Sequence, residues 1–201
     1  MKVLVAPLRA CFLILVYVFC AAAQIPSPKD VLGFMPGDDR KLASWAQVVD
    51  YFKKLDAASD RIRFEEIGKS TMGAPFVFAT ISSPENLKNL AKYSEINKKL
   101  ADPRKLRSRD MQPAPEVSAA AVQRLIKDGK TIVLITFGIH STEVGSYLSS
   151  MLVAHELASS NAPRIKKILD ETIILLVPSL RSYIVKVTLK FSTDSIDNSE
   201  F

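Results

Sequence analysis

Cysteine and glycine are scarce in this sequence, and both shortages exclude classes of protein. With 7 glycines and 11 prolines in 201 residues, the chain is neither collagen-like nor of low complexity, and an apolar content of 48% excludes full disorder. Its two cysteines, Cys11 and Cys20, both lie within the first 23 residues. No internal repeat divides the chain, and its length suits a single well-buried domain.

A run long enough to span a membrane is also lacking. The apolar run at residues 10–23 is about 14 residues long, whereas a span needs roughly 20. Lys2 and Arg9 precede this run, and three alanines end it just before Gln24. These features are typical of a secretory signal peptide that is cleaved after Ala23, so we expect a secreted or periplasmic protein.

Cleavage at this position changes both the charge and the cysteine content. It leaves 178 residues, lowers the net charge from +6 to +4 and removes both cysteines, which excludes disulfides and thiolate chemistry. So mild a basic excess does not indicate a nucleic-acid partner, and no membrane partner is expected after cleavage. A lipid anchor on Cys20 is disfavoured, because the bulky Phe19 stands where a small residue usually precedes a lipidated cysteine.

The hydrophobic pattern predicts an α/β protein. Residues 24–40 are expected to form an extended arm, with a helix from Asp38 or Asp39 to about Leu55. Further strands are expected at residues 62–68, 75–82, 131–137 and 172–177, further helices at 83–100, 117–127, 143–159 and 161–169, and a loop at 102–116. The continuous apolar run at 131–137 is typical of a strand covered on both faces, and the order strand, helix, helix, strand from there to residue 177 is a crossover unit.

One short segment carries residues suited to chemistry, at the carboxyl end of the strand that closes with Phe137. It reads Gly138-Ile139-His140-Ser141-Thr142-Glu143 and leads into a helix, a position where ligands often bind. In a helix-like turn His140 and Glu143 would project to one side, and imidazole nitrogen and carboxylate oxygen both bind zinc at about 2.0–2.2 Å. The alternatives are a histidine that forms an ordinary loop hydrogen bond and a glutamate that merely favours the positive end of a helix.

This segment resembles the His-x-x-Glu zinc motif of the zinc metallocarboxypeptidases, the carboxypeptidase A-like family. Upstream, Gly68-Lys69-Ser70-Thr71-Met72-Gly73 is similar to the Gly-x-Ser-x-x-Gly turn of that family's early hairpin. The resemblance covers about residues 44–180. It implies a mixed, largely parallel sheet flanked by helices, one zinc ion with His140 and Glu143 as its first two ligands, and hydrolysis at the C-termini of peptides or proteins.

The resemblance ends after Leu180. The family continues here with Pro-x-x-Asn-Pro-Asp-Gly, whereas this chain reads Pro178-Ser179-Leu180-Arg181-Ser182-Tyr183 and stops at Phe201. The third zinc ligand, a histidine, is therefore missing, as are the family's Asn-Arg pair that grips the substrate carboxylate, its lid tyrosine and its general-base glutamate. We expect an incomplete domain, from a truncated or frame-shifted copy, with no identifiable catalytic residue and little or no peptidase activity.

No other residue is expected to complete the site. His155, the second of two histidines, lies twelve residues beyond Glu143, roughly 18 Å along a helix, so it is expected to be a core or half-buried histidine. The other acidic residues considered as a base are expected to be solvated surface groups: Glu65, Glu66, Glu156, Asp170 and Glu171.

The predicted organisation is a signal peptide at 1–23, an extended arm at 24–40, a partial zinc-carboxypeptidase-like catalytic domain at 41–180 and an atypical tail at 181–201. In this tail, apolar residues alternate with polar ones between residues 183 and 191, which fits a half-buried strand on an unfinished sheet edge or an accidental pattern. An open edge also predicts poor solubility. Two alternative functions remain: a related zinc amide or acyl hydrolase of small molecules, and a secreted non-catalytic binding protein or relic.

Overall fold

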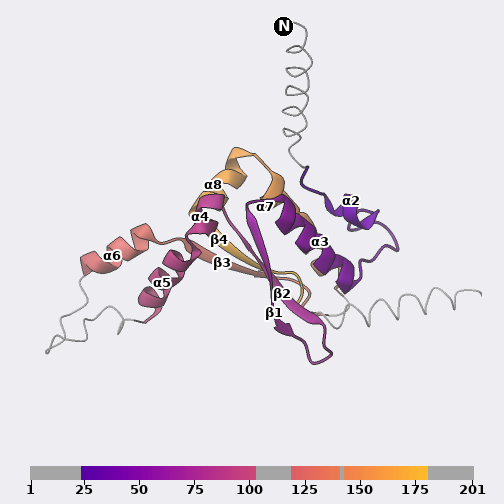
Figure 1. The fold of residues 1–201 in the computed structure, drawn as a ribbon, viewed down its shortest axis with the longest axis horizontal. Helices are drawn as coiled ribbons and strands as arrows, with labels where there is room; N and C mark the ends of the chain where they lie inside the picture. The colour runs from indigo at the N-terminus through magenta and orange to yellow at the C-terminus, as the bar shows by residue number, and fades with distance from the viewer. Residues whose placement is uncertain (1–23, 103–118, 141–142, 181–201) are drawn as a thin grey trace, which may run out of the picture.

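The computed structural model describes residues 24–102, 119–140 and 143–180, and Figure 1 shows their arrangement. The predicted signal peptide, the predicted loop at 102–116 apart from its first residue, and the predicted tail at 181–201 lie outside these residues. Four strands form one sheet in the order β1-β2-β4-β3. Their bounds agree with the predicted strands: β1 (Ile62–Lys69), β2 (Pro75–Ile81), β3 (Thr131–Thr136) and β4 (Thr172–Val177).

The sheet is mixed, which confirms the predicted α/β class. β1 and β2 form an antiparallel hairpin, β2 pairs antiparallel with β4, and β3 pairs parallel with β4 from Thr131 opposite Thr172 to Thr136 opposite Val177. The predicted crossover unit is thus present as β3, two helices and β4. Within the described residues the sheet is less parallel than expected, because the hairpin inserts β2 beside β4.

Seven helices flank this sheet in the part of the chain that the structure describes. They are α2 (Pro28–Leu32), α3 (Trp45–Ala58), α4 (Pro84–Lys88), α5 (Leu90–Ala101), α6 (Ala119–Asp128), α7 (Val144–Ser159) and α8 (Pro163–Glu171). None of these helices is long and apolar enough to cross a bilayer.

One predicted helix start and the predicted extended arm differ from the structure, and capping explains both. α3 begins after Ser44, whose Oγ accepts from the Gln47 amide at 3.2 Å while Gln47 Oε1 accepts from the Ser44 amide at 2.8 Å. This reciprocal capping box overrides the predicted start at Asp38 or Asp39. A second capping box, between Ser27 and Asp30, starts α2, so the segment 24–40 is not extended throughout as predicted.

The helix predicted at 83–100 begins as expected but is interrupted. Ser83 caps α4, accepting from the Asn86 amide at 3.4 Å. The backbone then leaves helical geometry at Asn89, with φ −106° and ψ 17°, before α5 begins. The Asn89 side chain donates to the carbonyl of Glu85 at 2.9 Å, and such local side-chain bonds compete with continued helix.

The main hydrophobic core lies between one face of the sheet and α3 and α7 (Figure 1). Phe52 of α3 stacks on Phe64 of β1 with ring centroids 5.5 Å apart, and the Trp45 indole donates to the carbonyl of Pro75 at 3.1 Å. The largest side chains that are fully buried include Tyr51, Phe52, Leu55, Ile62, Ile81, Met151, Leu169 and Leu176. These contacts tie the hairpin, α3 and the crossover unit into one body.

The opposite face of the sheet is covered much less. A small cluster centred on Tyr93, Ile96 and Ile173 packs α5 against β4, and α6 contacts α5 without burying a residue completely. Ile132 and Leu134 of β3 are 41% and 64% exposed. The prediction that this run is covered on both faces is wrong for the described residues, because β3 lies at the edge of the sheet there.

Candidate metal centre

The candidate site stands where the parallel strands β3 and β4 end. The Phe137 amide donates to the carbonyl of Val177 at 3.0 Å, and the Leu180 amide donates to the carbonyl of Phe137 at 3.0 Å. These bonds extend the pairing of the two strands beyond their regular ladder. The chain then runs from Gly138 to the start of α7, as the sequence predicts.

Gly138 holds the base of this loop in a conformation that a side chain would prevent. Its φ is +59°, and a Cβ built there would lie 2.5 Å from Oγ of the buried Ser179. The Gly138 amide donates to Ser146 Oγ at 2.9 Å, which ties the loop to the first turn of α7. A glycine is therefore required here both for its backbone conformation and for its close approach to Ser179.

The two predicted ligands come together on this loop. His140 Nδ1 lies 2.9 Å from Glu143 Oε1, and the side chains are 67% and 55% exposed. Glu143 is the N-cap residue of α7, yet its side chain makes no capping hydrogen bond. The Glu143 carboxylate faces the imidazole, and its place at the start of α7 also suits a glutamate that favours the positive end of a helix.

The pair fits part of a zinc site. Two donors, each about 2.1 Å from one tetrahedral ion, lie roughly 3.4 Å apart, so these two atoms need to separate only slightly to share a cation. The remaining coordination positions have no protein donor in the described ranges, where no group of three or more His, Cys, Asp and Glu residues could hold a metal. The structure thus presents two donors on an exposed surface.

The other residues considered from the sequence lie where they were expected. His155 is half-buried on α7, and the five acidic residues considered as a base are all exposed. Ser146 and Ser179, which support the loop, were missed. They contact Gly138 across 8 and 41 positions of sequence, and no spacing rule indicates such contacts.

The chain was compared with protein families, with curated sequences and with solved structures. Residues 48–180 match the family model for zinc carboxypeptidases. No curated protein sequence matches the chain. Among solved structures, that of thrombin activatable fibrinolysis inhibitor (TAFI) is similar with a TM-score of 0.52 and 10% identity, over 83% of this chain and 33% of that chain.

The two matches carry different weight. At 10% identity the structural likeness shows the fold alone, and this chain spans about a third of the length of that protein. The family model covers more than half of the sequence, including the β1–β2 hairpin, the segment 138–143 and the crossover unit. The chain therefore belongs to the zinc carboxypeptidase family.

Proposed function

We propose that this chain carries part of the metal site of a zinc-dependent carboxypeptidase-type hydrolase, and that His140 and Glu143 are the two ligands it supplies to the metal ion. The supporting observation is the 2.9 Å approach of His140 Nδ1 to Glu143 Oε1 at the carboxyl end of β3. When bound, zinc supplies Lewis-acid chemistry for attack on an amide. The substrates, by family, are the C-termini of peptides or proteins.

The residues of this chain position the two donors. Gly138 anchors the loop through Ser146 and Ser179, and the Glu143 amide donates to the carbonyl of His140 at 3.3 Å, which closes a turn between the ligands. The Glu143 carboxylate supplies a negative charge beside the imidazole, which favours a cation between them. The loop thus holds both donors on the same side.

Two donors do not make a complete catalytic centre. The 201 residues contain two histidines, and His155 lies on α7 away from the loop, so a third histidine ligand is not among them. We propose that this chain binds zinc more weakly than a three-ligand site and by itself hydrolyses little or no peptide. We also propose that it is exported, on the evidence of the signal-peptide pattern at residues 1–23.

A zinc titration tests the metal site. Metal-free protein covering residues 24–201 would be titrated against a chromophoric chelator, with the bound metal counted by mass spectrometry. We expect about one zinc per chain, and at least a tenfold loss of affinity in His140→Ala and in Glu143→Gln. His155→Ala is the matched control, because it removes the other histidine and should leave the affinity unchanged.

The outcomes separate the metal site from the activity. Unchanged affinity in both ligand variants, with native circular dichroism, would refute the site, and no zinc binding at all would favour the non-catalytic alternative. Release of C-terminal residues from a peptide should not exceed the protein-free control. Release that requires both zinc and His140 would support the metal site but refute the proposed lack of activity.

A further inference from the structure

Among the described residues β3 is an edge strand, and its outer edge, called the free edge below, presents backbone groups as well as apolar side chains. The Phe137 amide points to β4, where it donates to Val177. Because successive peptide groups of a strand point to opposite edges, the amides of Ile132, Leu134 and Thr136 point away from β4. An exposed edge of this kind is a template for another strand.

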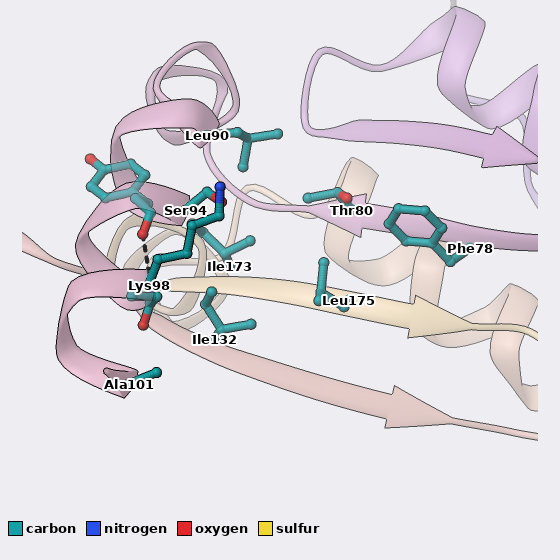
Figure 2. Close-up of a pocket in the computed structure, with 11 residues that line it drawn as sticks. Phe78, Thr80, Leu90, Ser94, Lys98, Ala101, Ile132, Ile173 and Leu175 are labelled. Carbon is teal, nitrogen blue, oxygen red and sulfur yellow. Dashed lines mark hydrogen bonds between the residues drawn. The ribbon is translucent and has the colours of Figure 1, made fainter. Parts of the chain in front are cut away.

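An apolar surface adjoins this edge on the less covered face of the sheet. A groove of about 510 Å³ lies between α5 and the strands, with Phe78, Leu90, Ile132, Ile173 and Leu175 among its lining residues (Figure 2). Side chains two positions apart share one face of a strand, so Leu134 continues this surface beyond Ile132. The groove and the edge together form one unfinished apolar face.

The chain offers a segment of matching pattern. Residues 183–191 lie outside the described residues, and their sequence alternates Tyr183, Val185, Val187, Leu189 and Phe191 with mostly polar neighbours. The described part ends at Leu180, whose amide bonds to Phe137 at the carboxyl end of β3. To reach the free edge, the chain must pass from β4 across the end of β3. This distance is about 10 Å, which roughly three extended residues span.

We propose that residues 183–191 add a strand antiparallel to β3 on its free edge. The odd-numbered apolar side chains then lie on the face of Ile132 and Leu134. Lys186 and Lys190 point to the other face, and the new edge carries charged residues of the kind that discourage further pairing. This inference is independent of the proposed zinc site.

Amide hydrogen exchange, resolved by NMR on residues 24–201, tests the pairing. We expect slow exchange at Ile132, Leu134 and Thr136, and exchange there at least tenfold faster in Val187→Lys, which puts a charge on the apolar face. Thr188→Lys is the matched control, because its neighbours on that side are lysines, and it should change nothing. The amides of Val133 and Ile135, which point to β4, should stay protected throughout and report that the sheet is intact.

Two results would overturn the proposal. One is fast exchange at all three outward amides in the parent protein. The other is slow exchange at these amides that persists in Val187→Lys. If this protection also increases with protein concentration, a second copy of the chain covers the edge instead of residues 183–191.

Discussion

At the scale of single residues, the contact between Gly138 and Ser179 positions the segment that carries the proposed ligands. Ser179 is 1% exposed, and its Oγ donates to the carbonyl of Gly138 at 3.4 Å. The serine follows β4, and the glycine follows β3. Any side chain at position 138 must therefore displace either the loop or the end of the neighbouring strand.

We predict that Gly138→Ala lowers the free energy of unfolding by about 2–4 kcal/mol, because it combines a left-handed backbone with a buried clash. Urea unfolding followed by the fluorescence of Trp45, the single tryptophan, measures the loss. Gly145→Ala is the control: it lies on α7 with open space around it and should be neutral or stabilising by up to about 1 kcal/mol. Equal stabilities for the two variants would contradict this account of the loop.

At the scale of elements, a buried polar network joins the end of β2 to the junction of α8 and β4. Ser82 Oγ donates to the carbonyl of Thr172 at 2.6 Å. Asn86 of α4, 3% exposed, donates from Nδ2 to the carbonyl of Leu169 at 2.9 Å and accepts at Oδ1 from the Tyr93 hydroxyl at 3.2 Å. One asparagine thus connects α4, α5 and α8.

Asn86→Ala should destabilise the protein by about 2–4 kcal/mol, because the substitution leaves the Tyr93 hydroxyl and the Leu169 carbonyl without this partner in a buried site. The half-buried Asn89 is the matched control, since its side-chain bonds are to Glu85 one turn earlier in the chain. Asn89→Ala should change stability by no more than about 0.5 kcal/mol. Chemical unfolding of both variants measures the two free energies of unfolding. Equal losses in the two variants would contradict a stabilising role for the Asn86 network.

At the scale of the whole molecule, two tyrosines in the main core connect its stability to pH. The hydroxyl of Tyr51 donates to the carbonyl of Pro26 at 3.4 Å, and that of Tyr147 to the carbonyl of Ala43 at 3.2 Å. Burial raises the pKa of Tyr147 to about 12. Burial, followed by the nearby Asp30, also raises the pKa of Tyr51.

These raised pKa values predict a loss of stability in alkali. Above pH 10 the unfolded chain releases the Tyr147 proton while the folded protein keeps it, so the free energy of unfolding falls by about 1.4 kcal/mol per pH unit until about pH 12. Tyr51 acts in the same direction. Urea unfolding between pH 8 and 11 should show this slope, and Tyr147→Phe should reduce it. An unchanged slope in that variant would contradict the assignment.

Most elements could be predicted because their signals are local. The alternation of β1 and β2, the glycine turn between them and the capping signal at Ser83 all act within a few residues. The pairing of His140 with Glu143 is local too, and the structure places the two side chains 2.9 Å apart, while zinc binding by them stays a prediction. The predicted helix start at Asp38 is wrong because the capping box of Ser44 and Gln47, which is also a local signal, starts α3 instead.

The tertiary arrangement could not be predicted from such signals. An apolar run shows that β3 and β4 are suited to burial. Among the described strands β4 lies between two neighbours and β3 at the edge, so similar runs are covered in one strand and exposed in the other. The support of Gly138 by Ser179 and of Ser82 by Thr172 spans 41 and 90 positions. Such contacts depend on how distant elements pack, and the pattern around either residue carries no information about its distant partner.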